Sequence, residues 1–180
     1  MIPILKSQRL ILRPFYLSDA KEVQRQAGNP KVAATTATIP HPYPDGAAEE
    51  WISKHAEWFE KRIAVDWAME LQETKKLIGC ISLGINKIHN RAELGYWVGE
   101  ENWGQGFCTE AAVSAIHYAF ESLGLNKITS RHMSENPSSG KVMIKVGMEK
   151  EGYLKQDFQK NGKYVDMFVY GLLRENFLSR

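Results

Sequence analysis

The chain has 180 residues, of which 43% are hydrophobic and 24% charged, and 23 basic against 21 acidic side chains leave a net charge of +2. This composition is typical of a soluble globular protein, and we expect one domain over residues 1–180. The small net charge favours neither a nucleic-acid nor a membrane partner. The sequence has no signal-peptide core, no apolar run near the roughly 18 residues of a membrane span and no CxxC pair, so we expect a cytoplasmic protein.

The first third of the chain shows a strand pattern followed by helix patterns. Residues 9–15 alternate between apolar and polar side chains, which predicts a strand. Asp19 and Glu22 then form a capping-box pattern that predicts a short helix. After a proline-rich loop over residues 34–46, we expect one amphipathic helix. Its apolar stripe recurs at spacings of four, three and four: Ile52, Ala56, Phe59 and Ile63.

The middle of the chain changes to a period of two, which predicts strands. Three such runs, at 65–71, 77–85 and 92–98, are joined by short turns and therefore indicate an antiparallel meander. A second apolar stripe from Thr109 predicts a helix that Gly124 ends.

The last third predicts a strand, a helix and a hairpin. Residues 127–133 form the strand, Asn136 and Pro137 are suited to cap and begin the helix, and Asn161 with Gly162 forms the hairpin turn. Taken together, these elements predict an α+β domain with a largely antiparallel sheet.

The segment NWGQGFCTEA, residues 102–111, joins the last strand of the meander to a helix. It is no dinucleotide fingerprint, because Thr109 stands where the third glycine belongs, and it does not fit the P-loop pattern. Glycines at a helix N-terminus nevertheless let backbone N–H groups converge on an anion such as pyrophosphate. The alternative is an ordinary turn between a strand and a helix.

The order of these elements, with YWVGEENWGQGFCTEA and ENPSSGKVMIKVGMEKEG, resembles the GNAT superfamily of acetyl-CoA-dependent N-acetyltransferases. The resemblance covers nearly the whole chain and is greatest for the branch that acetylates the N-terminal amines of ribosomal proteins. It implies the GNAT fold, a mixed and mostly antiparallel sheet with helices on both faces and two strands that splay at the cofactor site.

The resemblance also implies which residues bind acetyl-CoA. The turn that wraps the pyrophosphate aligns with Trp103, Gly104, Gln105, Gly106, Phe107 and Cys108, flanked by Trp97 and Thr109. Trp103 and Cys108 depart from the superfamily pattern of Gln or Arg and of Gly or Ala. The backbone of Val98 is expected to meet the thioester where a bulge splays its strand. Asn136, unless it only caps its helix, contacts the pantetheine arm, and Ser139 lies near the sulfur.

Acetyl transfer to an amine needs a base, a donor to the carbonyl oxygen and an acid for the leaving thiolate. We assign these roles to Glu93, the Val98 backbone and Ser139. Tyr153 is the alternative acid. Asp166 is a second candidate base, although among aromatic neighbours it is more readily explained by an ion pair with an arginine.

The acceptor is expected to be a protein N-terminal amine, because its pKa of about 7.7 to 8.0 demands less of a base than a lysine does. The loop PHPYPDG, residues 40–46, is expected to line the acceptor groove. A polyamine or an aminoglycoside is an alternative acceptor, and a non-catalytic acyl-CoA-binding module is an alternative function. No pair of histidines or cysteines has metal-ligand spacing, so no metal is expected. Exposed strand edges suggest a homodimer.

Overall fold

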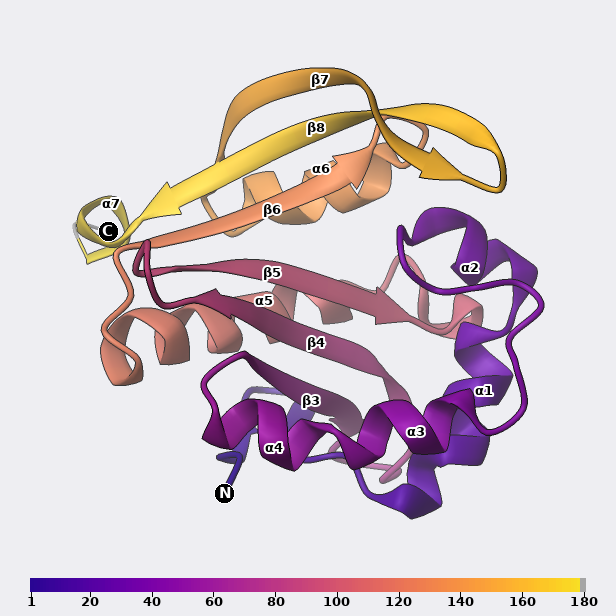
Figure 1. The fold of residues 1–180 in the computed structure, drawn as a ribbon. Coiled ribbons are helices and arrows are strands. Elements are labelled where there is room, and N and C mark those ends of the chain that lie inside the picture. Colours follow the sequence, from indigo (N-terminus) through magenta and orange to yellow (C-terminus); the bar gives the residue numbers. More distant parts are fainter. Residues whose placement is uncertain (179–180) are drawn as a thin grey trace.

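The computed structural model describes residues 1–178 and contains one eight-stranded sheet (Figure 1). The strand order is β1-β2-β3-β4-β5-β6-β8-β7, and all neighbours are antiparallel except β5 and β6. The strands are β1 (Leu5–Lys6), β2 (Leu10–Arg13), β3 (Ala64–Leu71), β4 (Leu77–Asn86), β5 (Arg91–Val98), β6 (Lys127–Met133), β7 (Glu149–Lys160) and β8 (Lys163–Leu173). The predicted meander is confirmed as β3, β4 and β5.

Helices cover both faces of the sheet, as expected. They are α1 (Ala20–Ala27), α2 (Pro30–Thr35), α3 (Ala47–Ser53), α4 (His55–Glu60), α5 (Phe107–His117), α6 (Pro137–Lys145) and α7 (Arg174–Leu178). Figure 1 shows α5 and α6 behind the sheet and α3 with α4 in front of it. Helix α5 continues as a π-helical segment, Tyr118–Ser122, and Gly124, at a φ of 66°, follows its end as predicted.

Each face of the sheet buries one layer of apolar side chains. Trp67, Leu83 and Leu94 face α5, where Ile116 and Phe120 complete the larger core. Ala68 and Cys80 face the other way and pack with α1 and α3 in a smaller core. The alternation that predicted these strands therefore reflects burial on both faces rather than one dry and one wet face.

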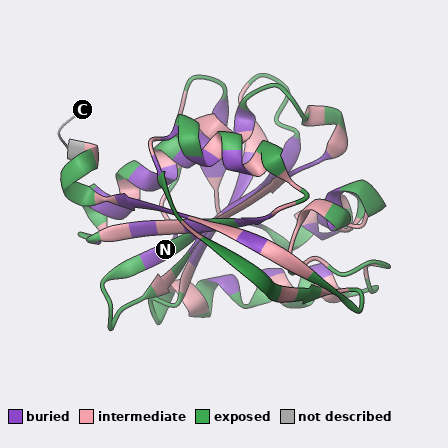
Figure 2. Ribbon diagram, turned by 90° about the horizontal axis from the view of Figure 1, so that it is seen from above, coloured by how far each residue is buried: buried purple, intermediate pink, exposed green. Residues whose placement is uncertain are grey.

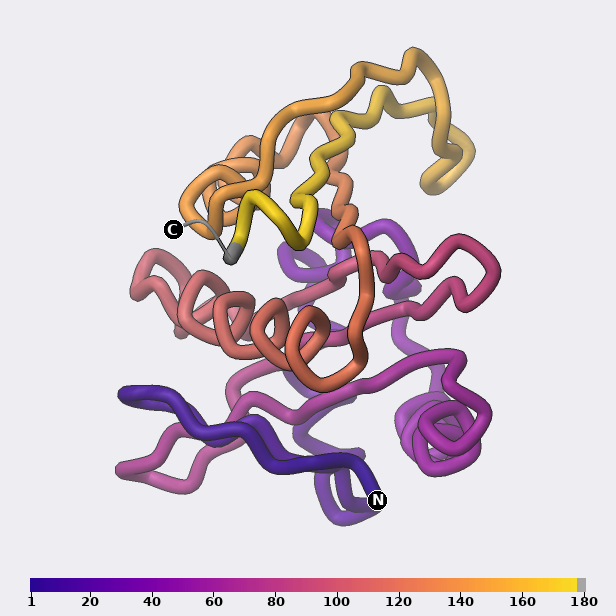
Figure 3. Tube along the Cα trace, turned by 90° about the vertical axis from the view of Figure 1, so that its left-hand side faces the viewer, coloured from indigo at the N-terminus to yellow at the C-terminus, as the bar shows by residue number. Residues whose placement is uncertain are grey.

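The C-terminal hairpin lies at the opposite end of the sheet from the N-terminal strands (Figure 3). Asn161 and Gly162 both have positive φ, 48° and 78°, which confirms the predicted turn. Strand β7 forms the outer edge and is largely exposed (Figure 2). Two register shifts interrupt its pairing with β8, and such bulges discourage the edge from pairing with another strand.

The helix expected after the proline-rich loop is interrupted at Lys54, which divides it into α3 and α4. The predicted stripe is also partly wrong, because Ala56 and Ile63 are exposed. His55 is buried instead and packs between the rings of Phe15, Trp51 and Trp58. Aromatic packing around a histidine, rather than a simple apolar stripe, therefore fixes these helices.

Two further features near the N-terminus differ from expectation. The carboxylate of Asp19 does not cap α1 in a box with Glu22; it accepts the Tyr16 backbone N–H at 2.8 Å and pairs with Arg13 at 2.8 Å. Helix α2 was not expected, although Asn29 caps it by accepting the backbone N–H of Lys31 at 2.8 Å and Pro30 begins it.

Candidate active site

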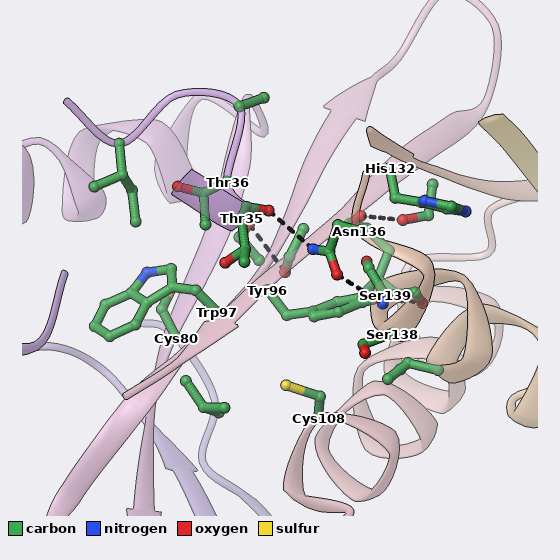
Figure 4. A pocket seen from close by; sticks show the side chains of 18 of the residues that line it. Thr35, Thr36, Cys80, Tyr96, Trp97, Cys108, His132, Asn136, Ser138 and Ser139 are labelled. Carbon is green, nitrogen blue, oxygen red and sulfur yellow. Dashed lines mark hydrogen bonds between the residues drawn. The ribbon is translucent and has the colours of Figure 1, made fainter. Parts of the chain in front are cut away.

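A cavity of about 890 Å³ opens where β5 and β6 diverge. Its lining comes mainly from these two strands, the start of α5, helix α6 and the loop that follows α2, with further residues from α1, α3, β3 and β4. Figure 4 shows Tyr96, Cys108 and Ser139 at this cavity, on β5, α5 and α6 respectively. Segments that are far apart in the sequence thus meet in one place.

The divergence arises because the ladder between β5 and β6 is short. It joins residues 91–93 to 127–129 and then ends. Beyond it, Ser130 Oγ donates a hydrogen bond of 2.8 Å to the carbonyl oxygen of Leu94, so a side chain replaces the next backbone partner. The predicted splay is confirmed, and the β4–β5 register runs to Val98 without a shift, so β5 stays paired with β4 where it leaves β6. A bulge as the cause of the splay stays a prediction.

The backbone of Val98 faces this opening. The Gly99 N–H donates to the Ile78 carbonyl at 2.9 Å, which makes these two residues a hydrogen-bonded pair of the β4–β5 ladder. Because such pairs alternate in an antiparallel ladder, the N–H and C=O groups of Val98 and Tyr96 are directed away from β4, toward β6. The Val98 carbonyl accepts the Trp103 indole N–H at 2.9 Å.

The glycine turn lies at one end of the cavity and begins α5. Gly104 and Gly106 have φ values of 74° and 81°, in the left-handed region that side chains avoid. A Cβ added at Gly104 would meet no atom within 4 Å, so the space beside this turn is open. An open turn of this kind at the N-terminus of an eleven-residue helix is suited to bind the oxygens of a phosphate or pyrophosphate.

Arg9, which sequence reasoning did not single out, braces this turn from the strand β2 side. Its Nη1 donates to the Gln105 carbonyl at 3.0 Å, its Nε pairs with Glu110 at 2.7 Å, and its guanidinium lies 4.5 Å from the centre of the Phe107 ring. Burial opposes the charge of Glu110, but hydrogen bonds from Arg9 and Ser7 outweigh it and lower the pKa of this carboxyl. Arg9 therefore compensates a negative charge in the first turn of α5, where an anion would otherwise be repelled.

The residues predicted to bind the cofactor come together, with one exception. Gln105 does not line the cavity; its side chain donates to the Glu101 carbonyl at 3.2 Å. The others contribute to the lining: Trp97, Val98, Trp103, Gly104, Gly106, Phe107, Cys108, Thr109, Asn136 and Ser139. Burial raises the pKa of the Cys108 thiol to about 12, so this cysteine is protonated at neutral pH and unsuited to act as a nucleophile.

Asn136 caps α6, as one of the two sequence interpretations expected. Its Oδ1 accepts the Ser139 backbone N–H at 3.3 Å, while its Nδ2 donates to the Thr35 carbonyl at 3.0 Å (Figure 4). The second bond ties α6 to the end of α2 across the cavity. Contact between Asn136 and a pantetheine arm stays a prediction.

Ser139 has a partner that the sequence did not indicate. The Tyr96 hydroxyl lies 2.9 Å from Ser139 Oγ and 2.9 Å from the Ser139 carbonyl oxygen. Burial raises the pKa of Tyr96, so the phenol keeps its proton. The two hydroxyls form a chain that can pass a proton into the cavity.

The other candidate acids and bases separate into two groups. Glu93 lines the cavity, is half-exposed and pairs with Arg131 at 3.0 Å. Tyr153 and Asp166 hydrogen-bond to each other on the C-terminal hairpin and do not line the cavity. Asp166 also accepts the Gln156 N–H at 2.8 Å, so its carboxylate is satisfied by a tyrosine and a backbone group, not by the expected arginine.

The cavity extends toward the loop after α2, where Ile39, Pro40 and Tyr43 line it together with Trp51. Lys160 of β7 donates to the Thr36 carbonyl and so attaches this loop to the hairpin. Part of the loop expected to border the acceptor therefore does border the cavity.

The floor of the cavity on the α1 and α3 side includes Asp66, which the sequence gave no reason to select. This residue is only 7% exposed, and its Oδ2 has no hydrogen-bond partner. Burial raises the pKa of the Asp66 carboxyl to about 7.

Within residues 1–178, no group of three potential ligands among His, Cys, Asp and Glu is arranged to hold a metal ion. Over the same residues, none of the helices is both long enough and apolar enough to cross a membrane.

Comparison with known proteins gives concordant matches. The family model described as an acetyltransferase (GNAT) domain matches residues 9–149. The chain is 31% identical over 175 residues to an uncharacterized N-acetyltransferase of Bacillus subtilis, YoaA, covering 97% of this chain and 98% of that protein. It is 35% identical over 96 residues to the ribosomal-protein-serine acetyltransferase of Escherichia coli, covering 53% of this chain and 54% of that protein.

A solved structure adds a ligand-bound relative. The spermidine N-acetyltransferase of Vibrio cholerae, in complex with CoA and spermine, is 26% identical to this chain. It matches with a TM-score of 0.81 over 94% of this chain and 98% of the other.

Proposed function

This chain belongs to the GNAT family of acetyltransferases, and from that premise we propose that it acetylates the N-terminal amine of a protein, such as a ribosomal protein. Membership makes it an acetyl-CoA-dependent N-acetyltransferase, as the sequence predicted. The acceptor proposal is supported by the likeness to the ribosomal-protein-serine acetyltransferase and, above all, by the setting of Glu93. A half-exposed carboxylate in an ion pair is a modest base, and an α-amine requires only a modest base.

Acetyl-CoA supplies the acetyl group as a thioester. We propose that the left-handed turn at Gly104 and Gly106, with the N-terminus of α5, holds the pyrophosphate through backbone N–H groups. The open space at Gly104 and the charge balance between Arg9 and Glu110 fit this role. The cavity between β5 and β6 then leads from this turn to the backbone of Val98.

The proposed roles of the chain's own groups follow from this position. Glu93, whose backbone is about 16 Å from that of Val98 along β5, takes the proton that the amine loses through a chain of several waters. The Val98 N–H donates a hydrogen bond to the carbonyl oxygen as negative charge develops on it, a kind of contact worth about 3 to 4 kcal/mol. Ser139 donates a proton to the departing sulfur and regains one through the Tyr96 hydroxyl, which is reprotonated in turn from solvent, while Glu93 returns the proton of the amine to solvent. A C–N bond forms and a C–S bond breaks, leaving an N-acetyl amine and a thiol.

A polyamine is the second candidate acceptor. The observation that favours it is the presence of two carboxylates, Asp66 and Glu93, in the lining of one cavity. The relative from Vibrio cholerae, a spermidine N-acetyltransferase, has the same fold. Carboxylates attract polycations, but Glu93 is already paired with Arg131.

The proposal takes residues 1–180 as one N-acetyltransferase domain in the cytoplasm. The continuous sheet supports one domain, and two free cysteines suit a reducing compartment. A homodimer is also proposed, because the C-terminal hairpin exposes Tyr153, Leu154 and Tyr164. Light scattering of the purified protein would test the dimer, and a monomer at all concentrations would contradict it.

The acceptor is tested by thiol release from acetyl-CoA in the presence of N-terminal peptides, lysine peptides with blocked N-termini, spermidine and an aminoglycoside. Release with the N-terminal peptides alone is the expected result. Release with spermidine but not with any peptide would replace the proposal by the polyamine candidate. A Glu93→Gln variant that keeps full activity would remove Glu93 from its proposed role.

A further inference from the structure

Asp66 occupies a defined position in the sheet. It pairs with Ser82 of β4, which in turn pairs with Gly95 of β5, so the three residues form one row across three strands. All three line the cavity, on the face that α1 and α3 cover. Ser82 Oγ lies over Gly95, since a Cβ added at Gly95 would come within 3.0 Å of it, closer than side chains usually approach.

The carboxylate of Asp66 has no compensating charge. Within residues 1–178, none of the ion pairs includes it, and Oδ2 is enclosed without a hydrogen-bond partner. Arg131, a cation that lines the same cavity, is engaged by Glu93 and by Asp157. A buried carboxylate is costly unless a partner binds it, so a group that enters the cavity is the natural source of that partner.

The surroundings of Asp66 favour an organic cation as that partner. Tyr43, Trp51 and Trp97 line the same cavity from the loop, α3 and β5. An anionic floor with aromatic walls is suited to an alkylammonium or guanidinium group, because ring faces and carboxylate both attract positive charge.

Asp66 lies too far from the proposed reaction centre to touch the reacting nitrogen. Neighbouring strands are about 4.8 Å apart, so the two steps from Asp66 to Gly95 span roughly 10 Å, and Val98 lies three residues, about 10 Å, farther along β5. The backbone groups of Val98 and Tyr96 face the far side of β5, toward β6. A cation at Asp66 is therefore a different group from the amine that attacks.

We propose that Asp66 is a specificity-determining residue that binds a second cationic group of the acceptor, since its backbone lies roughly 14 Å from that of Val98, beside which the acetylated amine is placed. The inference rests on the proposed function, which places the attacking amine beside Val98. The acceptor class that it defines is a peptide with a lysine or arginine next to its N-terminal residue. A polyamine also carries a second cationic group besides the amine that reacts, but it is a small molecule and not a peptide.

The test is an Asp66→Asn variant assayed with matched acceptors. One pair is an N-terminal peptide with lysine or norleucine at its second position, and the other is spermidine or hexylamine. In the variant we expect KM to rise at least tenfold for the lysine peptide and to stay unchanged for the norleucine peptide and for acetyl-CoA. Glu121→Gln, which removes a carboxylate outside the cavity lining, is the control and should change none of these values.

Equal changes for both members of a pair, or no change for either, would overturn the proposal. Turnover of spermidine alone, with a KM that rises in Asp66→Asn while hexylamine is unaffected, would support the subsite and contradict the proposed peptide acceptor. If no acceptor is turned over, the change in Tm when the lysine peptide or spermidine is added tests the subsite instead. A shift with the lysine peptide or spermidine that Asp66→Asn abolishes supports the subsite, and the absence of any shift in the unaltered protein overturns it.

Discussion

At Asp66 a single residue makes the stability of the fold depend on pH. Burial raises its pKa from 3.8 to about 7, so between these values the folded state holds a proton that the unfolded state has lost. Stability therefore falls as pH rises from about 4 to about 7, by at most ~4 kcal/mol. We expect Asp66→Asn to raise the unfolding free energy at pH 8 and to have little effect at pH 4, measured by urea denaturation.

A second buried group, His55, also makes the stability of the fold depend on pH, so its effect must be separated from that of Asp66. Burial lowers the pKa of His55 from 6.5 to about 4, so this residue destabilises the fold as pH falls through the same window. A His55→Phe variant removes that second effect and serves as the background for a repeat. An equal gain from Asp66→Asn at pH 4 and pH 8 in both backgrounds would show that charge burial is not the cause.

The contact between Tyr96 and Ser139 predicts a coupled loss of activity. Ser139→Ala removes the proposed proton donor and should lower kcat about 100-fold with little effect on KM for acetyl-CoA. Tyr96→Phe should lower kcat less, because Ser139 remains. If Tyr96 acts through Ser139, the double variant will be no slower than Ser139→Ala. If steady-state kinetics instead show that the fold-loss in kcat of the double variant is the product of the two single losses, the two residues act independently.

At the scale of elements, the turn before α5 offers a matched comparison of two glycines. Gly104 and Gly124 both have left-handed φ values, 74° and 66°, and a Cβ at either would meet no atom within 4 Å. Alanine at each position should cost a similar ~1 to 2 kcal/mol of stability. We expect only Gly104→Ala to raise KM for acetyl-CoA, by about tenfold, since only Gly104 lines the cavity. An equal rise in KM for Gly124→Ala would assign the effect to stability alone.

The elements that the sequence predicted well are those whose signals are local. Alternation placed β3, β4 and β5, and the pair Asn161–Gly162 placed the hairpin turn. The same kind of local signal, Asn29 before Pro30, was available for α2 but lay at the edge of a loop rich in prolines. The stripe ending at Ile63 was misjudged because the cluster around His55, which includes Phe15, depends on contacts between distant segments.

The residues of the candidate site also fall into those that a local sequence pattern marks and those that it does not. The glycine turn and the Asn136 cap are each marked by a short run of consecutive residues, and the family resemblance drew attention to them. Arg9, Tyr96 and Asp66 reach the site through strand pairing and through contacts that join residues about a hundred positions apart, such as Arg9 with Glu110. No short pattern marks a residue whose importance comes from its neighbours across a sheet.

At the scale of the whole molecule, the cavity separates two parts of the sheet that share few bonds. Strands β1 to β5 meet β6, β8 and β7 through the three residue pairs that join β5 to β6. Beyond them the side chains of Ser130 and Asn136 bond across the opening to Leu94 and Thr35. A ligand that contacts both the glycine turn of α5 and α6 should therefore couple the two parts.

Acetyl-CoA is expected to stabilise the fold through this coupling. At 100 times its Kd, a ligand adds about 2.7 kcal/mol, which for a chain of this length raises Tm by roughly 5 to 10 °C. Hydrogen exchange should show the added protection mainly in α6, β6 and the first turn of α5, whereas β2 and β3 should change little. Protection confined to the turn at Gly104 would show that the ligand binds one part only, and Gly104→Ala should reduce both the Tm shift and the protection of α6.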